Sequence, residues 1–276
     1  MVETPQATPI YVEYPETDGQ PMTESDATRN YLVYCVEALR LFFQSRPQVY
    51  VSGNLFIYYE EGKPEKNFSP DVFVIFGVSK RERRSYKVWL EGGKLPSFVL
   101  EITSLSTKKQ DEEAKPKLYA LLGIQEYFQY DPTGDYLKQQ LKGKRLVNSS
   151  YEPIQPETLP DGTVSLHSQI LGLDLRLLPL SSQSTLNFPE LSTLARELRL
   201  FDPQTGAKLL NYRESEQARQ EAEQVANEER QRAEQERQRA EQERQRAEQE
   251  RQRAEQAEQQ LAELLERLKS QGSEPK

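Results

Sequence analysis

The chain has 276 residues, a formal net charge of −8, one cysteine and one histidine. A single cysteine, Cys35, excludes an intrachain disulfide and a zinc site built on several cysteines, and a single histidine, His167, excludes a metal site with paired histidines. The acidic balance lacks the basic excess typical of nucleic-acid-binding domains. The sequence still contains a local basic cluster, made of Lys80, Arg81, Arg83, Arg84 and Lys87.

Residues 1–22 are rich in Pro, Thr and Gln and lack hydrophobic periodicity, which predicts a loose N-terminal arm. Apolar residues at helical spacing then predict a helix from about 24 to 45, with Thr23 as its N-cap. Cys35 lies within this helix and is expected to be a buried structural thiol. No segment resembles a signal peptide or is long enough to span a bilayer, so we expect a soluble, cytoplasmic protein without a membrane association.

Short apolar runs alternate with turn residues over the next hundred positions. They predict a helix over 108–122 that stops at Gly123. They also predict strand-like runs over 49–51 and 55–59, joined through Gly53, and strands over 71–76, 98–103 and 127–130, with a short apolar segment over 86–90. The strands 71–76 and 98–103 are almost continuously apolar, which indicates that both of their faces are covered. The order of these elements predicts an α/β (α+β) fold, with a mixed β-sheet flanked by helices.

The segment from about 135 to 212 is interpreted as a β-rich extension of the same domain, which we place over residues 23–212. Its expected strands cover 137–141, 145–147, 171–178 and 198–201. Two similar segments, Asp131-Pro132-Thr133-Gly134 and Asp202-Pro203-Gln204-Thr205-Gly206, are typical of β-turns. His167 is expected in a polar turn, at the surface or at a strand edge.

Residues 213–276 repeat with a period of seven and predict a long charged helix. One heptad position holds Ala233, Ala240, Ala247, Ala254, Leu261 and Leu268. Alanine buries little area in each heptad, so any coiled coil should be weak. A solvated single helix and a helix that binds itself or a helical partner through 213–269 both stay open.

Two acidic residues stand in apolar strands: Asp71 begins one run and Glu101 lies inside another. A carboxylate in a buried strand is costly unless it is paired or binds a metal. Two such carboxylates on adjacent strands, with a lysine nearby, can hold Mg²⁺ (or Mn²⁺) and activate a water for phosphodiester hydrolysis. The main-chain carbonyl of Glu101 or Ile102 is a candidate third ligand.

The candidate lysine is Lys115, because Asp111, Lys115 and Tyr119 are spaced to share one helix face. Pro116 disfavours a helical conformation at the preceding residue, so the helix can instead begin near Pro116. Structural alternatives also exist: Asp71 as a turn residue, Glu101 on an exposed strand face, and Tyr119 as core packing. Other lysines that can serve the site are Lys108, Lys109 and Lys117.

Taken together, these motifs resemble the Uma2 family of restriction-endonuclease-like proteins, of the cyanobacterial type with a charged helical tail. The resemblance rests on Pro70-Asp71, the segment 101–107, the helix with Asp111, Lys115 and Tyr119, the segment 123–128 and Asp131-Pro132. It covers residues 24–135 well and extends loosely to about 210.

Membership would imply a PD-(D/E)xK nuclease fold and a Mg²⁺-dependent endonuclease acting on DNA. Asp71 and Glu101 would then be metal ligands, and Lys115 would replace the strand lysine, where this chain has Thr103. The alternative is a non-catalytic scaffold with a nuclease fold, which binds a partner or self-associates through its charged C-terminal helix.

Overall fold

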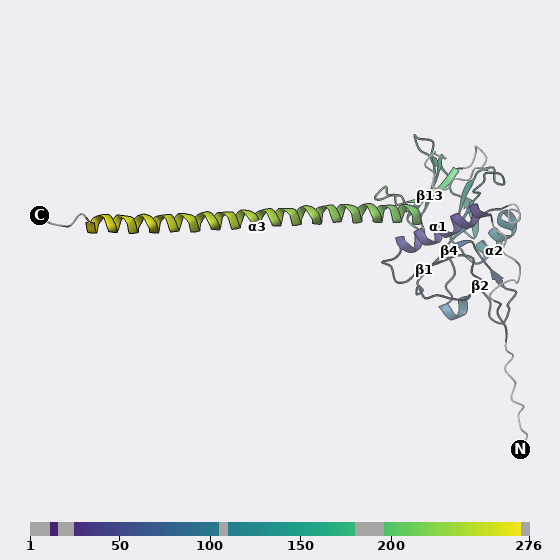
Figure 1. Ribbon diagram of the computed structural model, residues 1–276. Helices are drawn as coiled ribbons and strands as arrows, with labels where there is room; N and C mark the ends of the chain where they lie inside the picture. Colours follow the sequence, from purple (N-terminus) through teal and green to yellow (C-terminus); the bar gives the residue numbers. More distant parts are fainter. Residues whose placement is uncertain (1–11, 16–24, 105–109, 180–195, 272–276) are drawn as a thin grey trace, which may run out of the picture. The chain divides into compact units, whose positions relative to one another are not determined.

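The structure is a computed structural model that describes residues 12–15, 25–104, 110–179 and 196–271 (Figure 1). The chain divides into two units, Met1–Arg213 and Glu214–Lys276, which are described separately. The predicted mixed α/β architecture with a long C-terminal helix is confirmed. Across the described ranges, no helix is both long and apolar enough to cross a membrane.

A six-stranded sheet forms the centre of the first unit, in the order β1-β4-β6-β7-β8-β9. Only β6 and β7 among these neighbours run parallel, because the connection between them crosses over through α2. The bounds are Val49–Ser52 (β1), Val72–Phe76 (β4), Phe98–Ile102 (β6), Glu126–Tyr130 (β7), Leu141–Val147 (β8) and Ser150–Pro153 (β9).

Two smaller sheets complete the unit. One has the order β10-β11-β12-β13 and the other the order β3-β2-β5. Their bounds are Ile57–Tyr58 (β2), Asn67–Phe68 (β3), Tyr86–Lys87 (β5), Glu157–Thr158 (β10), Val164–Ser168 (β11), Leu173–Pro179 (β12) and Arg196–Phe201 (β13).

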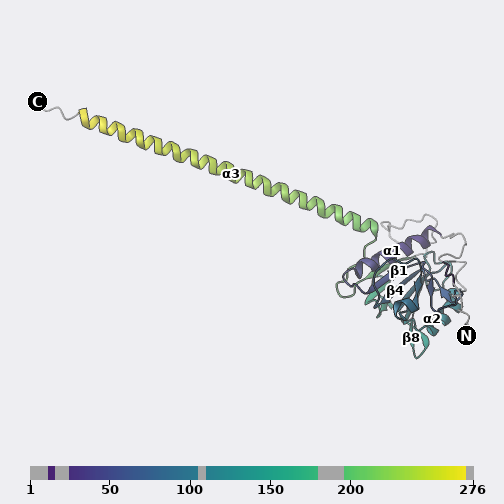
Figure 2. The same ribbon diagram turned by 90° about the horizontal axis from the view of Figure 1, so that it is seen from below.

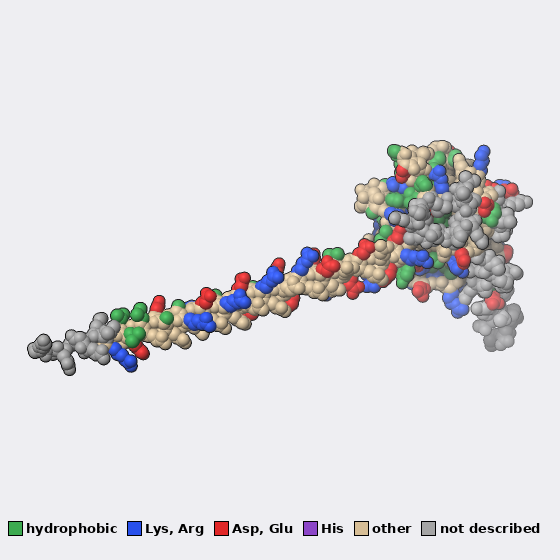
Figure 3. Space-filling view, turned by 45° about the horizontal axis from the view of Figure 1, so that its top comes forward, with side chains coloured by type: hydrophobic (Ala, Val, Ile, Leu, Met, Phe, Trp, Pro, Cys, Tyr) green, Lys and Arg blue, Asp and Glu red, His purple; other side chains and the backbone are tan. Residues whose placement is uncertain are grey.

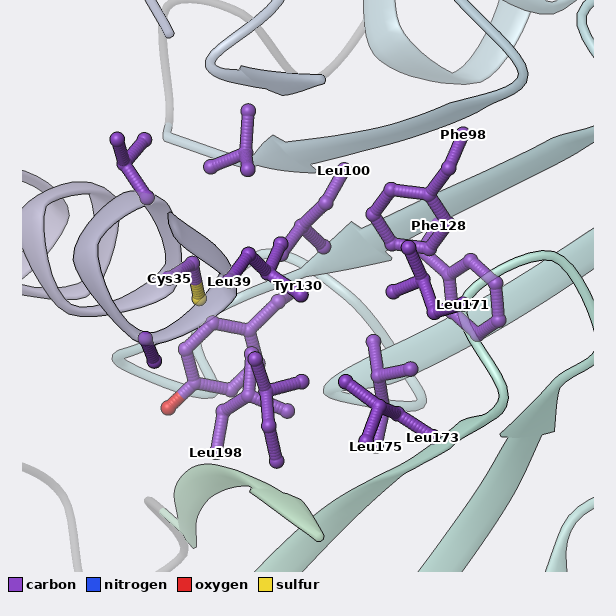
Figure 4. Packing of buried hydrophobic residues seen from close by; sticks show 14 of the residues in the cluster. Cys35, Leu39, Phe98, Leu100, Phe128, Tyr130, Leu171, Leu173, Leu175 and Leu198 are labelled. Carbon is purple, nitrogen blue, oxygen red and sulfur yellow. The ribbon is translucent and has the colours of Figure 1, made fainter. Parts of the chain in front are cut away.

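Helix α1, Asp26–Phe42, covers one face of the central sheet together with the β10–β13 sheet. Its N-cap is Ser25, whose Oγ accepts a hydrogen bond from the Thr28 amide at 3.2 Å. Figure 4 shows Cys35 and Leu39 of α1 pointing toward Leu100 and Tyr130 of the central sheet. Cys35 is fully buried, as predicted, and burial raises the pKa of its thiol to about 12.

The opposite face of the central sheet is covered by α2, Lys115–Leu121, and by the β3-β2-β5 sheet. In Figure 2, α1 and α2 lie on opposite sides of β1 and β4. Successive residues of a strand point to opposite faces, so Val72 and Val74 join the α1 core whereas Phe73 and Ile75 join the α2 core. The expectation that both faces of β4 and β6 are covered is therefore confirmed.

Several predicted elements differ from those observed. Helix α1 is shorter than the expected 24–45, and the expected N-cap Thr23 lies outside the described residues. The short apolar segment 86–90 divides into β5 and a 3₁₀ turn, η1 (Val88–Glu91). In place of the expected strand 55–59, only β2 forms. The expected strands 137–141 and 145–147 are replaced by the single strand β8. The strands β3, β9, β10 and β11 were not predicted. His167 lies within β11, opposite Asp174 on β12, and not in a turn.

The helix predicted over 108–122 is divided in two. A π-helical turn, η2 (Gln110–Ala114), leads directly into α2, which begins at Lys115 with Pro116 in its first turn. Proline is tolerated there because the first helical amides have no intrahelical acceptor. Gly123 follows the helix at φ +76°, which supports its predicted role at the C-terminus.

The described part of the predicted N-terminal arm is held against the domain. The Tyr14 hydroxyl accepts a hydrogen bond from the Gly62 amide at 2.6 Å, and its ring packs on Tyr58 and Trp89. The Tyr58 hydroxyl donates to the Pro15 carbonyl. Residues 12–15 are thus not loose, whereas 1–11 and 16–22 lie outside the described residues.

The second unit is formed by α3, Tyr212–Gln271, a single uninterrupted helix. Figure 3 shows acidic and basic side chains alternating along it, with hydrophobic side chains gathered toward its C-terminal end. The apolar residues Leu261, Leu264 and Leu265 are between 49% and 59% exposed.

Candidate active site

The two predicted acidic residues lie side by side at one end of the central sheet. Val72 of β4 pairs with Leu100 of β6, so the next antiparallel step places Asp71 opposite Glu101. The Asp71 Oδ2 atom accepts a hydrogen bond from the Ile102 amide at 2.7 Å, and the Asp71 amide lies 3.4 Å from Glu101 Oε2. The sheet register itself therefore brings these two carboxylates together.

Two side chains of α2, those of Lys115 and Tyr119, contact the Glu101 carboxylate on the face of the sheet that α2 covers. The Lys115 ammonium lies 2.8 Å from Glu101 Oε2, and the Tyr119 hydroxyl donates to Oε1 at 2.6 Å. Lys115 and Tyr119 are one helical turn apart, so both reach the same carboxylate. Glu101 is fully buried, and burial beside this carboxylate raises the pKa of Tyr119 well above its usual value. The predicted lysine is therefore in contact with one of the predicted acids.

The main-chain carbonyl of Ile102 points toward β4, the strand that begins one residue after Asp71. Thr103 donates its amide to Tyr130 of β7, so the neighbouring Ile102 amide and carbonyl point the other way, toward β4. The register places Pro70 opposite Ile102, and proline has no amide to donate to this carbonyl. The Pro70-Asp71 pair thus ends the ladder beside the site.

Gly53 allows the chain to pass close to Asp71. A Cβ atom on this glycine would lie 2.1 Å from the Asp71 carbonyl oxygen and 3.1 Å from Val36. The next amide, that of Asn54, donates to the Pro70 carbonyl at 2.9 Å. The position of Asp71 therefore depends on a residue without a side chain at position 53.

The donor set fits a hard divalent cation of the Mg²⁺ type. Within the described ranges, no group of three or more His, Cys, Asp or Glu side chains could hold a metal. Mg²⁺, however, is commonly bound through one or two carboxylates while keeping several waters. Asp71, Glu101 and the Ile102 carbonyl supply this kind of oxygen donor, and they offer no nitrogen or sulfur ligand.

Sequence reasoning missed two members of a polar row that crosses the sheet. Glu101 pairs with Gln129 of β7, which pairs with Lys142 of β8, so Asp71, Glu101, Gln129 and Lys142 follow one another on neighbouring strands. Paired residues point to the same face, here the face covered by α2. Gln129 interrupts the apolar run 127–130 as Glu101 interrupts 98–102, and this signal could have identified it.

Other predicted candidates do not join the site. Lys108, Lys109 and the side chain of Asp111 lie outside the described residues. Lys117 is exposed and lines a hollow with Ser150 and Tyr151 of β9. In the basic cluster, Arg81 and Arg83 pair with Glu91, while Lys80 donates to two carbonyls directly after α1, those of Phe43 and Gln44.

Two further buried acids have structural partners. Asp131 accepts hydrogen bonds from the amides of Thr133, Gly134, Tyr136 and Leu137 and so fixes the turn after β7. Glu126 pairs with Arg145. It also accepts hydrogen bonds from the Ser168 hydroxyl, at the end of β11, and from the Gln169 amide that follows. Neither acid contacts a group of the carboxylate pair.

Residues 7–180 match the model of the Uma2 family, described as "Putative restriction endonuclease". This match spans more than half of the chain, so the chain belongs to the Uma2 family.

One similar solved structure is described as "a putative nuclease belonging to DUF820" from Anabaena variabilis. It is 14% identical, with 56% of this chain and 81% of that chain covered and a TM-score of 0.39. No curated protein matches the chain.

Proposed function

We propose that this protein is an endonuclease that depends on Mg²⁺ or Mn²⁺ and hydrolyses DNA phosphodiester bonds at the Asp71–Glu101 pair. The observation that carries the proposal is the contact of Lys115 with Glu101, beside Asp71, at the end of the ladder between β4 and β6. A buried acid needs a partner, and a flexible lysine that is 22% exposed is a partner that substrate can still reach.

The proposed metal-binding groups are the carboxylates of Asp71 and Glu101 and the carbonyl of Ile102. The Ile102 amide fixes one oxygen of Asp71, and Tyr119 fixes one oxygen of Glu101, so each carboxylate keeps a defined orientation. When bound, a divalent cation neutralises charge on a phosphate and makes a water molecule more acidic.

Lys115 is proposed to stabilise negative charge that develops on the phosphate during hydrolysis. Its ammonium is held by Glu101 at 2.8 Å, so a small rotation would turn it toward a phosphate oxygen at the edge of the site. Thr103 stands two residues after Glu101 and carries no charge, and within the described ranges Lys115 is the cation that contacts Glu101.

The test is nicking of a supercoiled plasmid with Mg²⁺ or Mn²⁺ by the wild type, Asp71→Asn and Glu101→Gln. We expect each substitution to lower the nicking rate by about 100-fold or more, because each removes a charge from the proposed metal site. Metal removal with EDTA should abolish nicking in the wild type. The matched control is Glu113→Gln, an exposed acid of η2. Equal rates for all four proteins would contradict the proposal.

A second function, a non-catalytic scaffold, is favoured by one observation: the exposed leucines near the C-terminal end of α3. In this alternative a second copy binds through these leucines. Light scattering of the full chain and of a Leu261→Lys, Leu265→Lys variant measures it. A monomeric wild type would exclude self-association.

A further inference from the structure

Two buried polar atoms beside Glu101 have no hydrogen-bond partner among the described residues. They are Oγ1 of Thr103 and Nε2 of Gln129. Thr103 is fully buried and Gln129 is 1% exposed, so neither atom is satisfied by bulk solvent. Unpaired buried polar groups are rare in native proteins and call for a specific explanation.

The sheet places the side chains of Thr103 and Gln129 next to the side chain of Glu101. Gln129 pairs directly with Glu101, and Thr103 lies two residues after Glu101, directly beyond the end of β6. The Thr103 amide donates to Tyr130 at 2.7 Å, so the ladder and the alternation of faces continue through Thr103. Glu101, Thr103 and Gln129 therefore point to the same face, on adjacent strands.

We infer that Thr103 and Gln129 hold one ordered water molecule against the Glu101 carboxylate. A buried water typically makes about three hydrogen bonds to polar groups that are otherwise unpaired. The Thr103 hydroxyl, the Gln129 amide and a remaining lone pair of Glu101 supply three such partners. Each carboxylate oxygen has two lone pairs. Oε2 faces both Lys115 and the Asp71 amide, whereas Oε1 accepts from Tyr119 and keeps a lone pair for this bond.

This inference rests on the proposed function and deepens it. The water would lie on the inner side of Glu101, away from Lys115, and would fix the carboxylate from the sheet as Tyr119 fixes it from α2. Thr103 and Gln129 are thus positioning residues that act through Glu101. Their loss should lower kcat for nicking and leave KM unchanged.

The first test is a high-resolution crystal structure of the full chain, together with that of Thr103→Val. We expect an ordered water within hydrogen-bond distance of Thr103 Oγ1 and the Gln129 amide in the wild type, and its loss in Thr103→Val. A protein side chain bonded to these atoms, or no ordered water between them, would overturn the inference. This readout does not depend on nuclease activity.

The second test compares nicking by Thr103→Val, which removes only the hydroxyl, with Thr103→Ser, which keeps it. We expect Thr103→Val and Gln129→Met to lower kcat about tenfold, a change of about 1.4 kcal/mol by the rate relation, with KM within about twofold. Thr103→Ser should keep the wild-type kcat. Equal kcat values in Thr103→Val and the wild type would overturn the inference.

Thr163 provides a matched control, because it is also a buried threonine but lies before β11 and outside the site. Thr163→Val should nick at the wild-type rate, and a loss equal to that of Thr103→Val would overturn the inference.

Titration calorimetry should give the same Kd for Mg²⁺ in Thr103→Val and the wild type. A tenfold weaker Kd would make Thr103 part of metal binding and also overturn it. A wild type that neither binds metal nor nicks would contradict the proposed function, while the crystal structures would still decide on the water.

Discussion

Glu101 and Glu126 are both fully buried and stand on neighbouring strands of the same sheet, yet their surroundings differ. Glu126 begins β7 and faces the α1 side, where it accepts hydrogen bonds from Arg145, the Ser168 hydroxyl and the Gln169 amide. Glu101 lies near the end of β6 and faces α2, where it contacts Lys115 and Tyr119. The strands are parallel, so the two acids occupy opposite ends as well as opposite faces.

The difference separates a structural acid from a candidate functional one. Glu126 is bound by an arginine, by the hydroxyl of Ser168 at the end of β11 and by main-chain amides directly after β11, and these groups join two sheets. Glu101 is bound by a flexible lysine and lies beside Asp71 and two polar atoms that have no partner in the described part of the chain. Burial of a carboxylate therefore says little about function until its partners are known.

The largest expected effect is a contrast between two variants: Glu126→Gln should mainly lose stability, whereas Glu101→Gln should mainly lose nicking activity. Glu126→Gln leaves Arg145 without its buried partner, so the free energy of unfolding should fall by about 3 kcal/mol. Glu101→Gln can still accept a hydrogen bond from Tyr119, so its free energy of unfolding should fall by about 1 kcal/mol, while it should nick at least about 100-fold more slowly. Urea unfolding and plasmid nicking of both variants measure this. If both variants lost stability alone, Glu101 would be a second structural acid.

Gly53→Ala should reduce both stability and activity, because the new Cβ atom would lie 2.1 Å from the Asp71 carbonyl oxygen. Relief of this overlap must move the chain at Asp71, at a cost of about 2 kcal/mol. Thermal unfolding and nicking measure the two effects. Ser52→Ala, one residue earlier, should change neither by a comparable amount. Full activity in Gly53→Ala would show that the position of Asp71 is unimportant.

Tyr119→Phe removes the hydroxyl that donates to Glu101 and keeps the packed ring. A hydrogen bond to a buried carboxylate contributes about 1.5 kcal/mol, so we expect a loss of this size in the free energy of unfolding. Nicking should also slow, because Glu101 would lose one orienting partner. Tyr59→Phe, on a ring that packs in the same core, is the control. Unchanged unfolding in Tyr119→Phe would argue that this hydrogen bond contributes nothing.

The Arg83–Glu91 pair tests a partly buried structural acid by its pH dependence. Hydrogen bonds from Arg83 lower the pKa of Glu91 below its usual value. A lowered pKa in the folded state gives stability that is present above the unfolded pKa, near 4.3, and is lost as the pH falls through the folded pKa. Glu91→Gln should therefore lose about 1 kcal/mol at pH 7 and show a flatter decline in acid. Parallel stability curves for the two proteins would exclude this contribution.

The smallest effect is expected from removal of residues 214–276. These residues form a separate unit, so the first unit should keep its melting temperature within about 1 °C, because no core residue is removed. Differential scanning calorimetry of the truncated and full chains measures this. A large fall in the melting temperature would show that α3 stabilises the nuclease-like unit.

Much of the fold could be predicted from the local pattern. The period of seven predicted α3, and apolar runs predicted β4, β6 and β7. The short strands β3, β9, β10 and β11 were missed, because they have little apolar pattern of their own and exist through pairing with neighbours. The π-helical turn before Lys115 was also missed, although Pro116 indicated that a regular helix could begin there.

The sequence alone identified Asp71 and Glu101 as candidates for a site. An acid in an apolar strand is expected to be buried, and a buried charge requires a partner. The sequence could not indicate which acids are structural, since Glu126 and Asp131 carry the same chemical group. Only the tertiary structure placed Lys115, Tyr119, Thr103 and Gln129 around Glu101, because the sheet register and the position of α2 bring together residues far apart in the chain.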